Sequence, residues 1–365
     1  MSSPDDIAKA LGAAIGNNDD ESTVTHFLDT GFPPLNFALS SNWDKGLPVG
    51  RIVEIAGPPS SGKTAIATRA MAACQAQGGV AGFMDHERSF SVRLAPQLGL
   101  DVTPGRFVFK KPRTFEESVA IFHKAVETIR SKKLIPADAP ICWVFDSLAA
   151  MVPQSVIFDS KGKERSAEDR NMNDNTALAR ATSAHFPSIA MIAEEYNVCV
   201  IFLNQLRTKI GVMFGDPRKT TGGDSAAYYF SQRIWLGASQ IKKGTDVIGT
   251  EVTGKLVKNK VARPFLDAKW RFMFQPDGTG RFDAERSLID FLEQEGRLEK
   301  ASRAGFVMWD GKQVSRDNLA DLIRAEGAAG FDKLKALLPP SYEPEVVAFV
   351  EGVTEEEAEA QATAA

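Results

Sequence analysis

The sequence has few cysteines and no long apolar run. Three of its 365 residues are cysteine and none forms a Cys-x-x-Cys pair, so neither a zinc site nor a disulfide framework is indicated. No apolar stretch approaches the roughly 18–20 residues that cross a membrane. Residues 1–20 lack the basic start and apolar centre of a secretory signal. We therefore expect a cytoplasmic protein with no membrane partner.

Net charge of either sign is also small. The chain has 43 Lys and Arg against 47 Asp and Glu, a formal charge of −4. That balance excludes a uniformly basic nucleic-acid binder, but it leaves room for a local basic face. Residues 341–365 contain seven Glu and no Lys or Arg, so this end is strongly acidic. Such a tail either competes with polyanions for the body or simply keeps the protein in solution, and the sequence leaves both interpretations open.

Apolar runs and helical patterns alternate between residues 50 and 274, which predicts an α/β fold with a mostly parallel central sheet. The expected strands are 51–56, 80–85, 141–146, 198–204 and 233–237, and the expected helices are 63–77, 115–130 and 176–196. Two later strands, 252–259 and 268–274, are expected to be antiparallel because only a short turn with Pro264 separates them. Right-handed crossovers place the carboxyl ends of the parallel strands on one edge.

The two ends of the chain have a different pattern. Residues 8–15 predict a short helix, followed by a loop over 16–20. This helix packs either on a neighbouring subunit or back on its own domain. Helical patterns over 287–294, 316–325 and 331–338 predict a small α-rich domain. We therefore expect an N-terminal helix and linker (1–33), an α/β core (34–282), a C-terminal domain (283–340) and an acidic tail (341–365).

One motif points directly to a nucleotide. The pattern GxxxxGK[ST] lies after an apolar strand and before a helix, in Gly57, Pro58, Pro59, Ser60, Ser61, Gly62, Lys63 and Thr64. Glycines let backbone N–H groups face phosphate oxygens, and the start of the following helix adds a positive dipole end. Lys63 then reaches the β- and γ-phosphates and Thr64 ligates Mg²⁺. The predicted cofactors are ATP and Mg²⁺.

Three other strands end in polar side chains suited to the same site. Asp146 ends an apolar strand and is expected to support Mg²⁺, with Ser147 beside it. Glu87 follows another strand, and it is either the base that activates water or a surface cap, with Asp85 as a structural acid. Gln205 ends a fourth strand, where its amide either senses the γ-phosphate or is an ordinary strand terminus.

Five segments together resemble the RecA/RadA recombinase family, and its bacterial RecA branch most closely. They are residues 46–55, 83–87, 145–150, 257–265 and, most densely, 201–223 with the sequence IFLNQLRTKIGVMFGDPRKTTGG. The resemblance covers most of residues 30–275, and a divergent or phage-encoded member is one interpretation. It implies a RecA-type P-loop ATPase core, an N-terminal polymerisation helix and a small DNA-gathering C-terminal domain. The implied activity is ATP-dependent assembly of helical filaments on single-stranded DNA, followed by pairing and strand exchange with duplex DNA.

The resemblance also assigns roles to individual residues. It implies that Glu87 activates water, that Gln205 couples the γ-phosphate to DNA binding, and that Lys258 and Lys260 reach the ATP of a neighbouring protomer. The alternative for the two lysines is a pair of solvated side chains on a strand.

Two loops carry the DNA site in this family. The second matches residues 206–223, and its candidate DNA-binding residues are Arg207, Lys209, Gly211, Val212, Met213, Phe214, Arg218, Lys219, Thr220, Thr221, Gly222 and Gly223. Cations there neutralise phosphates while an apolar side chain wedges between bases. The first loop, about 157–175, is a candidate by position alone.

The sequence departs from the family near the adenine, where Ser91 and Leu94 replace the usual Asp and Tyr. That change relaxes adenine specificity or affinity. The alternative function is a RecA-fold mediator or motor ATPase without strand exchange. Further expected partners are single-strand-binding and loader proteins, and the expected location is the nucleoid, or the host cytoplasm for a phage protein.

Overall fold

The structure is a computed structural model that describes residues 24–166, 176–208, 218–277 and 279–341, besides single positions near the N-terminus. Most of the helix expected over 8–15, residues 167–175 of the first candidate DNA loop, and the tail after residue 341 lie outside the described residues. None of the helices in the described ranges is long and apolar enough to cross a membrane.

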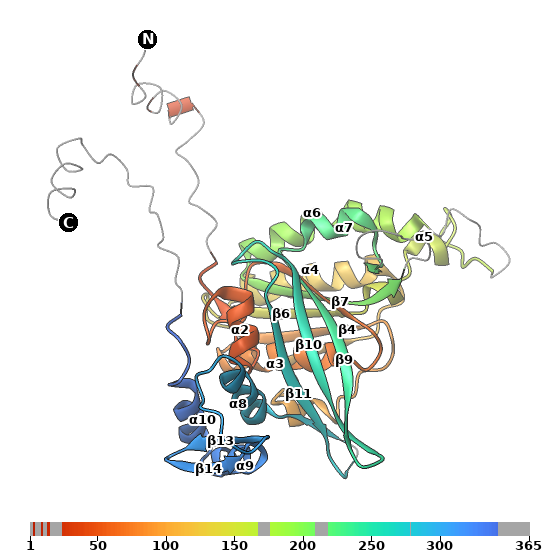
Figure 1. Ribbon diagram of the computed structural model, residues 1–365. Helices are drawn as coiled ribbons and strands as arrows, with labels where there is room; N and C mark the ends of the chain where they lie inside the picture. The colour runs from red at the N-terminus through yellow and green to blue at the C-terminus, as the bar shows by residue number, and fades with distance from the viewer. Residues whose placement is uncertain are drawn as a thin grey trace.

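A ten-stranded sheet forms the centre of the molecule (Figure 1). Its parallel strands are β3 (Ile52–Gly57), β4 (Val80–Asp85), β5 (Phe107–Lys110), β6 (Ile141–Asp146), β7 (Val198–Thr208) and β9 (Gln232–Lys243). Antiparallel β10 (Asp246–Asn259), β11 (Asp267–Phe274) and β12 (Gly280–Phe282) extend it, in the order β12-β11-β10-β9-β3-β7-β6-β4-β5. The tenth strand, β8 (Arg218–Thr220), lies off this path and pairs with β7. The predicted parallel core is confirmed, and so is the antiparallel pairing of the two later strands.

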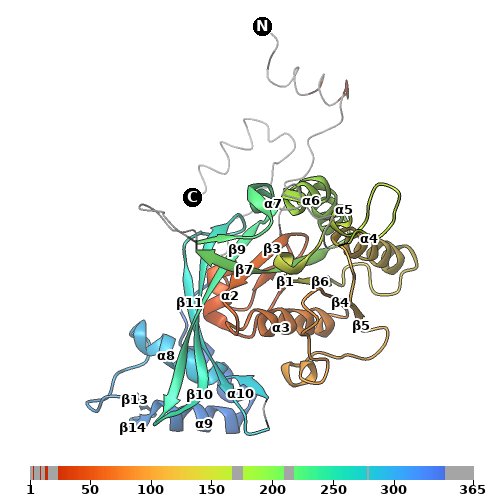
Figure 2. The same ribbon diagram turned by 90° about the vertical axis from the view of Figure 1, so that its right-hand side faces the viewer.

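Helices cover both faces of the parallel part (Figure 2). Helices α2 (Pro33–Ser40) and α3 (Lys63–Ala76) lie on one side, and α4 (Phe115–Ser131) and α6 (Ala177–Glu195) lie on the other. Strands β3, β4 and β6 are buried along their whole length, as strands covered on both faces must be. The start of α4 is capped by Thr114, whose Oγ1 accepts a hydrogen bond of 3.0 Å from Glu117 N.

The prediction was wrong about the length of the last strands. β9 and β10 form a long hairpin beyond Gly237, where the sequence predicted no strand before residue 252. Residues 238–247 are mostly polar and exposed, so they show no apolar run that would have signalled strands. The hairpin is held instead by its backbone ladder. The short edge strand β5 was missed as well.

The C-terminal elements contain the three expected helices, which are α8 (Ala284–Gln294), α9 (Arg316–Glu326) and α10 (Ala328–Lys335). They surround an apolar cluster of their own. The sequence analysis missed a hairpin of β13 (Phe306–Trp309) and β14 (Lys312–Ser315). Its turn places Asp310 and Gly311 at positive φ, 49° and 73°. An Asp-Gly pair is a known hairpin signal, so this element could have been found.

Trp43 joins the C-terminal elements to the core. Its indole Nε1 donates a hydrogen bond of 2.7 Å to the carbonyl oxygen of Pro339, and its ring stacks on Phe37 at 4.2 Å between centroids. Lys335 forms an ion pair with Asp44 at the same junction. These contacts fix the end of α10 beside the end of α2.

Candidate functional site

A cavity of about 460 Å³ lies at the carboxyl edge of the parallel strands. It gathers residues from the P-loop, the start of α3 and five other strands or strand ends. Its lining residues are Pro59, Ser60, Ser61, Gly62, Lys63, Thr64, Ala65, Glu87, Asp146, Gln205, Thr250, Phe272 and Phe274. The structure therefore brings together the side chains that the sequence predicted at separate strand ends.

The P-loop curls tightly between β3 and α3. A side chain at Gly57 would place Cβ 2.5 Å from Ser61 Oγ, so the close approach at this position requires glycine. Gly62, just before α3, has φ +86°, which other residues rarely adopt. Ser61 Oγ is buried, and it has no hydrogen-bond partner within the described part of the chain. A buried, unpartnered hydroxyl in a loop at a helix N-terminus fits a phosphate oxygen as its missing partner.

Lys63 closes the loop from inside the cavity. Its Nζ donates to the carbonyl oxygens of Gly57 at 3.1 Å and Pro58 at 2.9 Å. Burial lowers the pKa of Lys63, although the nearby carboxylates of Asp146 and Glu87 oppose that shift. Phosphate oxygens would replace the two carbonyl contacts with charged partners, so this ammonium group is suited to an anion.

Asp146 and Thr64 form the part of the cavity that suits a cation. Thr64 Oγ1 donates to Asp146 Oδ2 at 3.1 Å. Burial, and then the charge of Glu87, raise the pKa of Asp146 to about 7. A divalent cation between these oxygens would relieve both effects. No group of three or more Asp, Glu, His or Cys side chains that could hold a metal ion occurs among the described residues, so the remaining ligands would be phosphate oxygens and water, as Mg²⁺ commonly has.

Glu87 lies at the centre of a small polar cluster. Its Oε1 accepts hydrogen bonds from Ser147 Oγ and, at 3.3 Å, from Gln205 Nε2. The backbone N–H groups of His86 and Glu87 both donate to the carbonyl oxygen of Asp146, at 2.7 and 3.1 Å. The carboxylate is exposed and faces the cavity, so it is accessible to water.

Asp85 behaves differently from Glu87. It is fully buried, and its carboxylate accepts hydrogen bonds from the backbone N–H groups of Ser89 (3.2 Å) and Phe90 (3.3 Å). These contacts fix the turn that presents Glu87. The geometry agrees with the structural role expected for Asp85.

An aromatic wall was missed by the sequence analysis. Phe272 and Phe274 of β11 line the cavity, and Phe274 is 47% exposed. Ser91 and Leu94, the positions expected near the adenine, are exposed and are not among the lining residues. The two phenylalanines are two positions apart on a strand and so share one face. That spacing was the available signal, but nothing in it indicated that β11 reaches the P-loop.

The ends of the second candidate loop form a two-stranded ladder. β8 (Arg218–Thr220) pairs antiparallel with the end of β7, and Arg207 lies opposite Lys219. Arg207, Arg218 and Lys219 are exposed, as phosphate-binding side chains would be. The candidates Lys209, Gly211, Val212, Met213 and Phe214 lie outside the described residues.

The loop ends at the start of α7 (Gly223–Tyr229). Gly222 has φ +111°, and a side chain there would meet Leu148 at 2.7 Å. Its carbonyl oxygen accepts a hydrogen bond of 2.9 Å from Thr182 of α6. Gly222 and Gly223 therefore serve the backbone turn, whatever else they contact.

The described part of the first loop is held near α4. After α5 (Gln154–Ile157), Phe158 and Glu164 form an isolated bridge. Arg113 pairs with Glu164 at 2.8 Å and lies 5.5 Å from the ring of Phe158. Residues 167–175, the rest of this candidate loop, are outside the described ranges.

Lys258 and Lys260 are not among the residues that line the cavity. Lys258 Nζ donates to the carbonyl oxygens of Ala227 (2.8 Å) and Tyr228 (3.0 Å) at the end of α7. Burial, and then the charges of Lys260 and Arg233, lower the pKa of Lys258 to about 8. Within one chain this lysine stabilises a helix end and does not contact its own P-loop.

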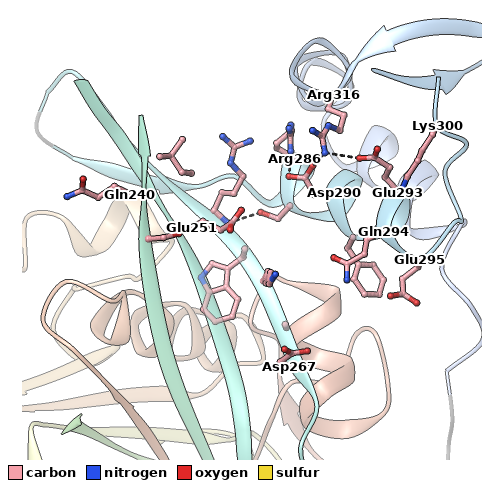
Figure 3. A pocket seen from close by; sticks show the side chains of 18 residues that line it. Gln240, Glu251, Asp267, Arg286, Asp290, Glu293, Gln294, Glu295, Lys300 and Arg316 are labelled. Carbon is pink, nitrogen blue, oxygen red and sulfur yellow. Dashed lines mark hydrogen bonds and ion pairs between the residues drawn. The ribbon is translucent and has the colours of Figure 1, made fainter. Parts of the chain in front are cut away.

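A larger cavity, about 780 Å³, lies between strands β9–β11 and helix α8 (Figure 3). Four of its charged side chains pair with one another. Arg316 Nη1 bonds Asp290 (2.8 Å) and Glu293 (2.7 Å), and Arg286 pairs with Asp290. No motif found in the sequence lies here, so its size does not make it the better candidate for chemistry.

Comparison with known proteins agrees with this geometry. Residues 6–279 match the family model described as the RecA N-terminal domain. The chain is 34% identical to Protein RecA of Chloroherpeton thalassium over 89% of this chain and 84% of that protein. It is 34% identical to Protein RecA 2 of Myxococcus xanthus, over 85% and 79%, and 35% identical to Protein RecA of Geobacter sulfurreducens, over 79% of each. The chain belongs to the RecA family of ATP-dependent DNA recombinases.

Proposed function

We propose that this RecA-family recombinase binds ATP in the 460 Å³ cavity and uses it to control a DNA site built on residues 206–223. The observation that carries the proposal is the convergence of Lys63, Thr64, Asp146, Glu87 and Gln205 on one cavity at the start of α3. Four chain segments far apart in sequence supply them. Such an arrangement suits phosphoryl transfer, in which positioning and charge stabilisation are the main contributions of the protein.

The triphosphate would lie along the P-loop, with Ser61 Oγ and Lys63 Nζ as donors to its oxygens. Thr64 and Asp146 would hold Mg²⁺, which neutralises charge on the β- and γ-phosphates when bound. Glu87 would orient and deprotonate the attacking water. Its hydrogen bonds to Ser147 and Gln205 support that role, because they fix the carboxylate at the open side of the cavity.

Lys258 and Lys260 would act on the ATP of a neighbouring protomer. Their position away from their own P-loop supports this assignment, since cations supplied across an interface stabilise developing phosphate charge as an arginine finger does. Hydrolysis would then require assembly of a helical filament, and residues 1–33 would supply its polymerisation contact. Before assembly, Lys258 would have to leave the end of α7.

Single-stranded DNA would bind at residues 206–223, where Arg207, Arg218 and Lys219 present cations on the β7–β8 ladder. Residues 157–175 are the second candidate segment. Residues 283–340 would gather duplex DNA, and the acidic tail after them would compete with it. Single-strand-binding and loader proteins would be partners at the nucleoid in the cytoplasm, or in a host cell for a phage protein.

The deciding experiment is joint-molecule formation between a single strand and a homologous supercoiled duplex. We expect product with ATP and homology, and none without nucleotide, with a heterologous duplex, or with the Lys63→Ala variant. A folded, ATP-hydrolysing protein that gives no product would instead be a mediator or motor. Electron microscopy of filaments against closed rings would separate those two.

A further inference from the structure

Glu54 is a buried carboxylate on the strand that leads into the P-loop, and it has no role in the proposed chemistry. It lies on β3, three residues before Gly57, and none of its surface is exposed. Its neighbours across the sheet are Phe202 on β7 and Arg233 on β9. A carboxylate buried in the middle of a sheet is costly unless charged and hydrogen-bonding partners satisfy it.

Each oxygen of this carboxylate holds one partner. Oε1 accepts a hydrogen bond of 2.8 Å from Asn204 Nδ2, and Oε2 accepts one of 2.7 Å from Arg233 Nε. Both partners also reach the outgoing end of the 206–223 loop. Asn204 Nδ2 donates to the carbonyl oxygen of Thr221 at 2.8 Å, and Arg233 Nη2 donates to Thr220 Oγ1 at 3.0 Å. One carboxylate thus fixes two successive loop residues through two independent arms.

The same network reaches the nucleotide cavity. Asn204 Oδ1 accepts a hydrogen bond of 2.9 Å from the backbone N–H of Gln205. Gln205 in turn contacts Glu87. The side-chain oxygen of Asn204 is therefore bonded to Gln205, and its nitrogen is bonded to Thr221. If the amide moves with Gln205, its hydrogen bond to Thr221 must change.

Aromatic contacts extend the network to the first residue of β8. The guanidinium groups of Arg233 and Arg218 lie 5.8 and 5.0 Å from the ring of Trp235. Both distances are within the range of cation–π attraction. The position of Arg218, a candidate phosphate-binding residue, is thus linked to the arginine that Glu54 holds.

We propose that Glu54 is a positioning residue that couples the occupant of the nucleotide cavity to the conformation of the 206–223 loop. It touches neither nucleotide nor DNA. It acts through Asn204 on one arm and Arg233 on the other, so that a shift at Gln205 reaches Thr220 and Thr221. This inference rests on the proposed role of the loop in binding single-stranded DNA.

The test separates coupling from stability. Removing one partner of a buried ion pair leaves an unpaired charge and destabilises the fold, whereas replacing both by apolar residues of similar size is often neutral. The variant Glu54→Leu/Arg233→Met follows this logic. The measurement is the affinity for a fluorescent oligodeoxythymidine, taken with a non-hydrolysable ATP analogue and with ADP. The ratio of the two affinities is the coupling, and melting temperature and nucleotide affinity are recorded alongside.

We expect the double variant to keep its melting temperature and its nucleotide affinity while the affinity ratio falls by about tenfold or more. Thr220→Val removes the acceptor of Arg233 Nη2 and leaves the buried pair intact. Loss of a direct contact between Thr220 and DNA would lower both affinities, whereas loss of the link to Arg233 should lower their ratio, by less than in the double variant. Glu194→Gln is the matched control, because it neutralises a glutamate paired with Arg51 (3.3 Å) at the opposite end of β3. It should leave the ratio unchanged.

Two other outcomes have distinct meanings. If wild-type protein shows no nucleotide-dependent affinity for the oligonucleotide, the proposed function fails before the inference is reached. If wild type shows it, and both the double variant and Thr220→Val retain the full ratio, Glu54 is only a structural residue and the inference is wrong. If the double variant does not fold, Thr220→Val alone decides. A lower affinity ratio in Thr220→Val supports the proposal, and an unchanged ratio overturns it.

Discussion

Gln205 Nε2 donates a hydrogen bond of 3.3 Å to Glu87 Oε1, and this contact joins β7 to the turn after β4. The proposed water-activating carboxylate is therefore held by the strand that continues into the β7–β8 ladder. A γ-phosphate entering the cavity would compete for the same amide. Nucleotide state can then be sensed without any change in the charge of Gln205.

Replacing Glu87 by Gln should stop hydrolysis and preserve binding. The amide keeps an oxygen that can accept from Ser147, but it cannot take a proton from water. General-base catalysis is typically worth about 10²–10⁴-fold, so we expect kcat for DNA-stimulated hydrolysis to fall by at least about 100-fold. Phosphate release measures the rate and a fluorescent ATP analogue measures the affinity. Near-normal hydrolysis would show that another group activates the water.

Replacing Gln205 by Ala should uncouple DNA from hydrolysis. The variant loses the contact to Glu87 but keeps the P-loop and Asp146. We expect the ratio of ATPase rates with and without single-stranded DNA to fall by about tenfold, with the DNA-free rate little changed. Gln77→Ala is the control. Gln77 lies just after the carboxyl end of α3, away from the cavity, and its Nε2 donates to the carbonyl oxygen of Phe27. An undiminished ratio in Gln205→Ala would leave Gln205 as an ordinary strand terminus.

Replacing Phe274 by Ala should weaken ATP binding without changing kcat. Stacking of a base on an aromatic ring contributes about 1–3 kcal/mol, so we expect KM for ATP to rise by about tenfold. The phosphate-binding residues are untouched. Phe265→Ala makes the same change at a ring that is 72% exposed and does not line the cavity, so its KM should stay at the wild-type value. Equal KM values for all three proteins would show that the base of ATP does not stack on Phe274.

Lys258 gives a pH-dependent prediction. Burial and nearby cations lower its pKa to about 8 from an ordinary value of 10.5, so the folded chain holds fewer protons here than the unfolded chain between those values. The destabilisation caused by this buried ammonium group is largest below pH 8 and disappears as the pH rises from about 8 toward 10.5. The contribution of Lys258 to the free energy of unfolding therefore increases with pH over that window.

Competitive amine labelling with mass spectrometry checks this directly, because only the neutral amine reacts. In protein without DNA or nucleotide, labelling of Lys258 should be half-maximal near pH 8. Exposed Lys255, on the same strand, provides the reference profile. We expect Lys258 to be protected when DNA and a non-hydrolysable ATP analogue are added, since assembly would place it against a phosphate. A Lys258 profile identical to that of Lys255 would contradict the shift.

The sequence predicted the cavity well because its residues follow apolar strands. Asp146 ends a buried strand, Glu87 lies two residues after another, and Gln205 follows the buried part of β7. Parallel topology gathers the carboxyl ends of such runs at one edge. Glu54 could not be recognised in this way. Its importance depends on β3 lying between β7 and β9, and on partners about 150 and 180 positions away in the chain. Phe272 and Phe274 were not predicted for the same reason: β11 is far from the P-loop in the sequence, and only the tertiary fold places the two side by side.

The β7–β8 ladder has a consequence for how such proteins diversify. Thr208 lies opposite Arg218, so the nine residues 209–217 leave and rejoin the sheet at adjacent backbone positions. The span that this segment must bridge is set by the ladder and not by its own length. A doubling of loop length costs only about 0.6 kcal/mol of closure free energy. A longer segment between Thr208 and Arg218 would therefore add little closure free energy, and the ladder that sets its two ends would not have to change.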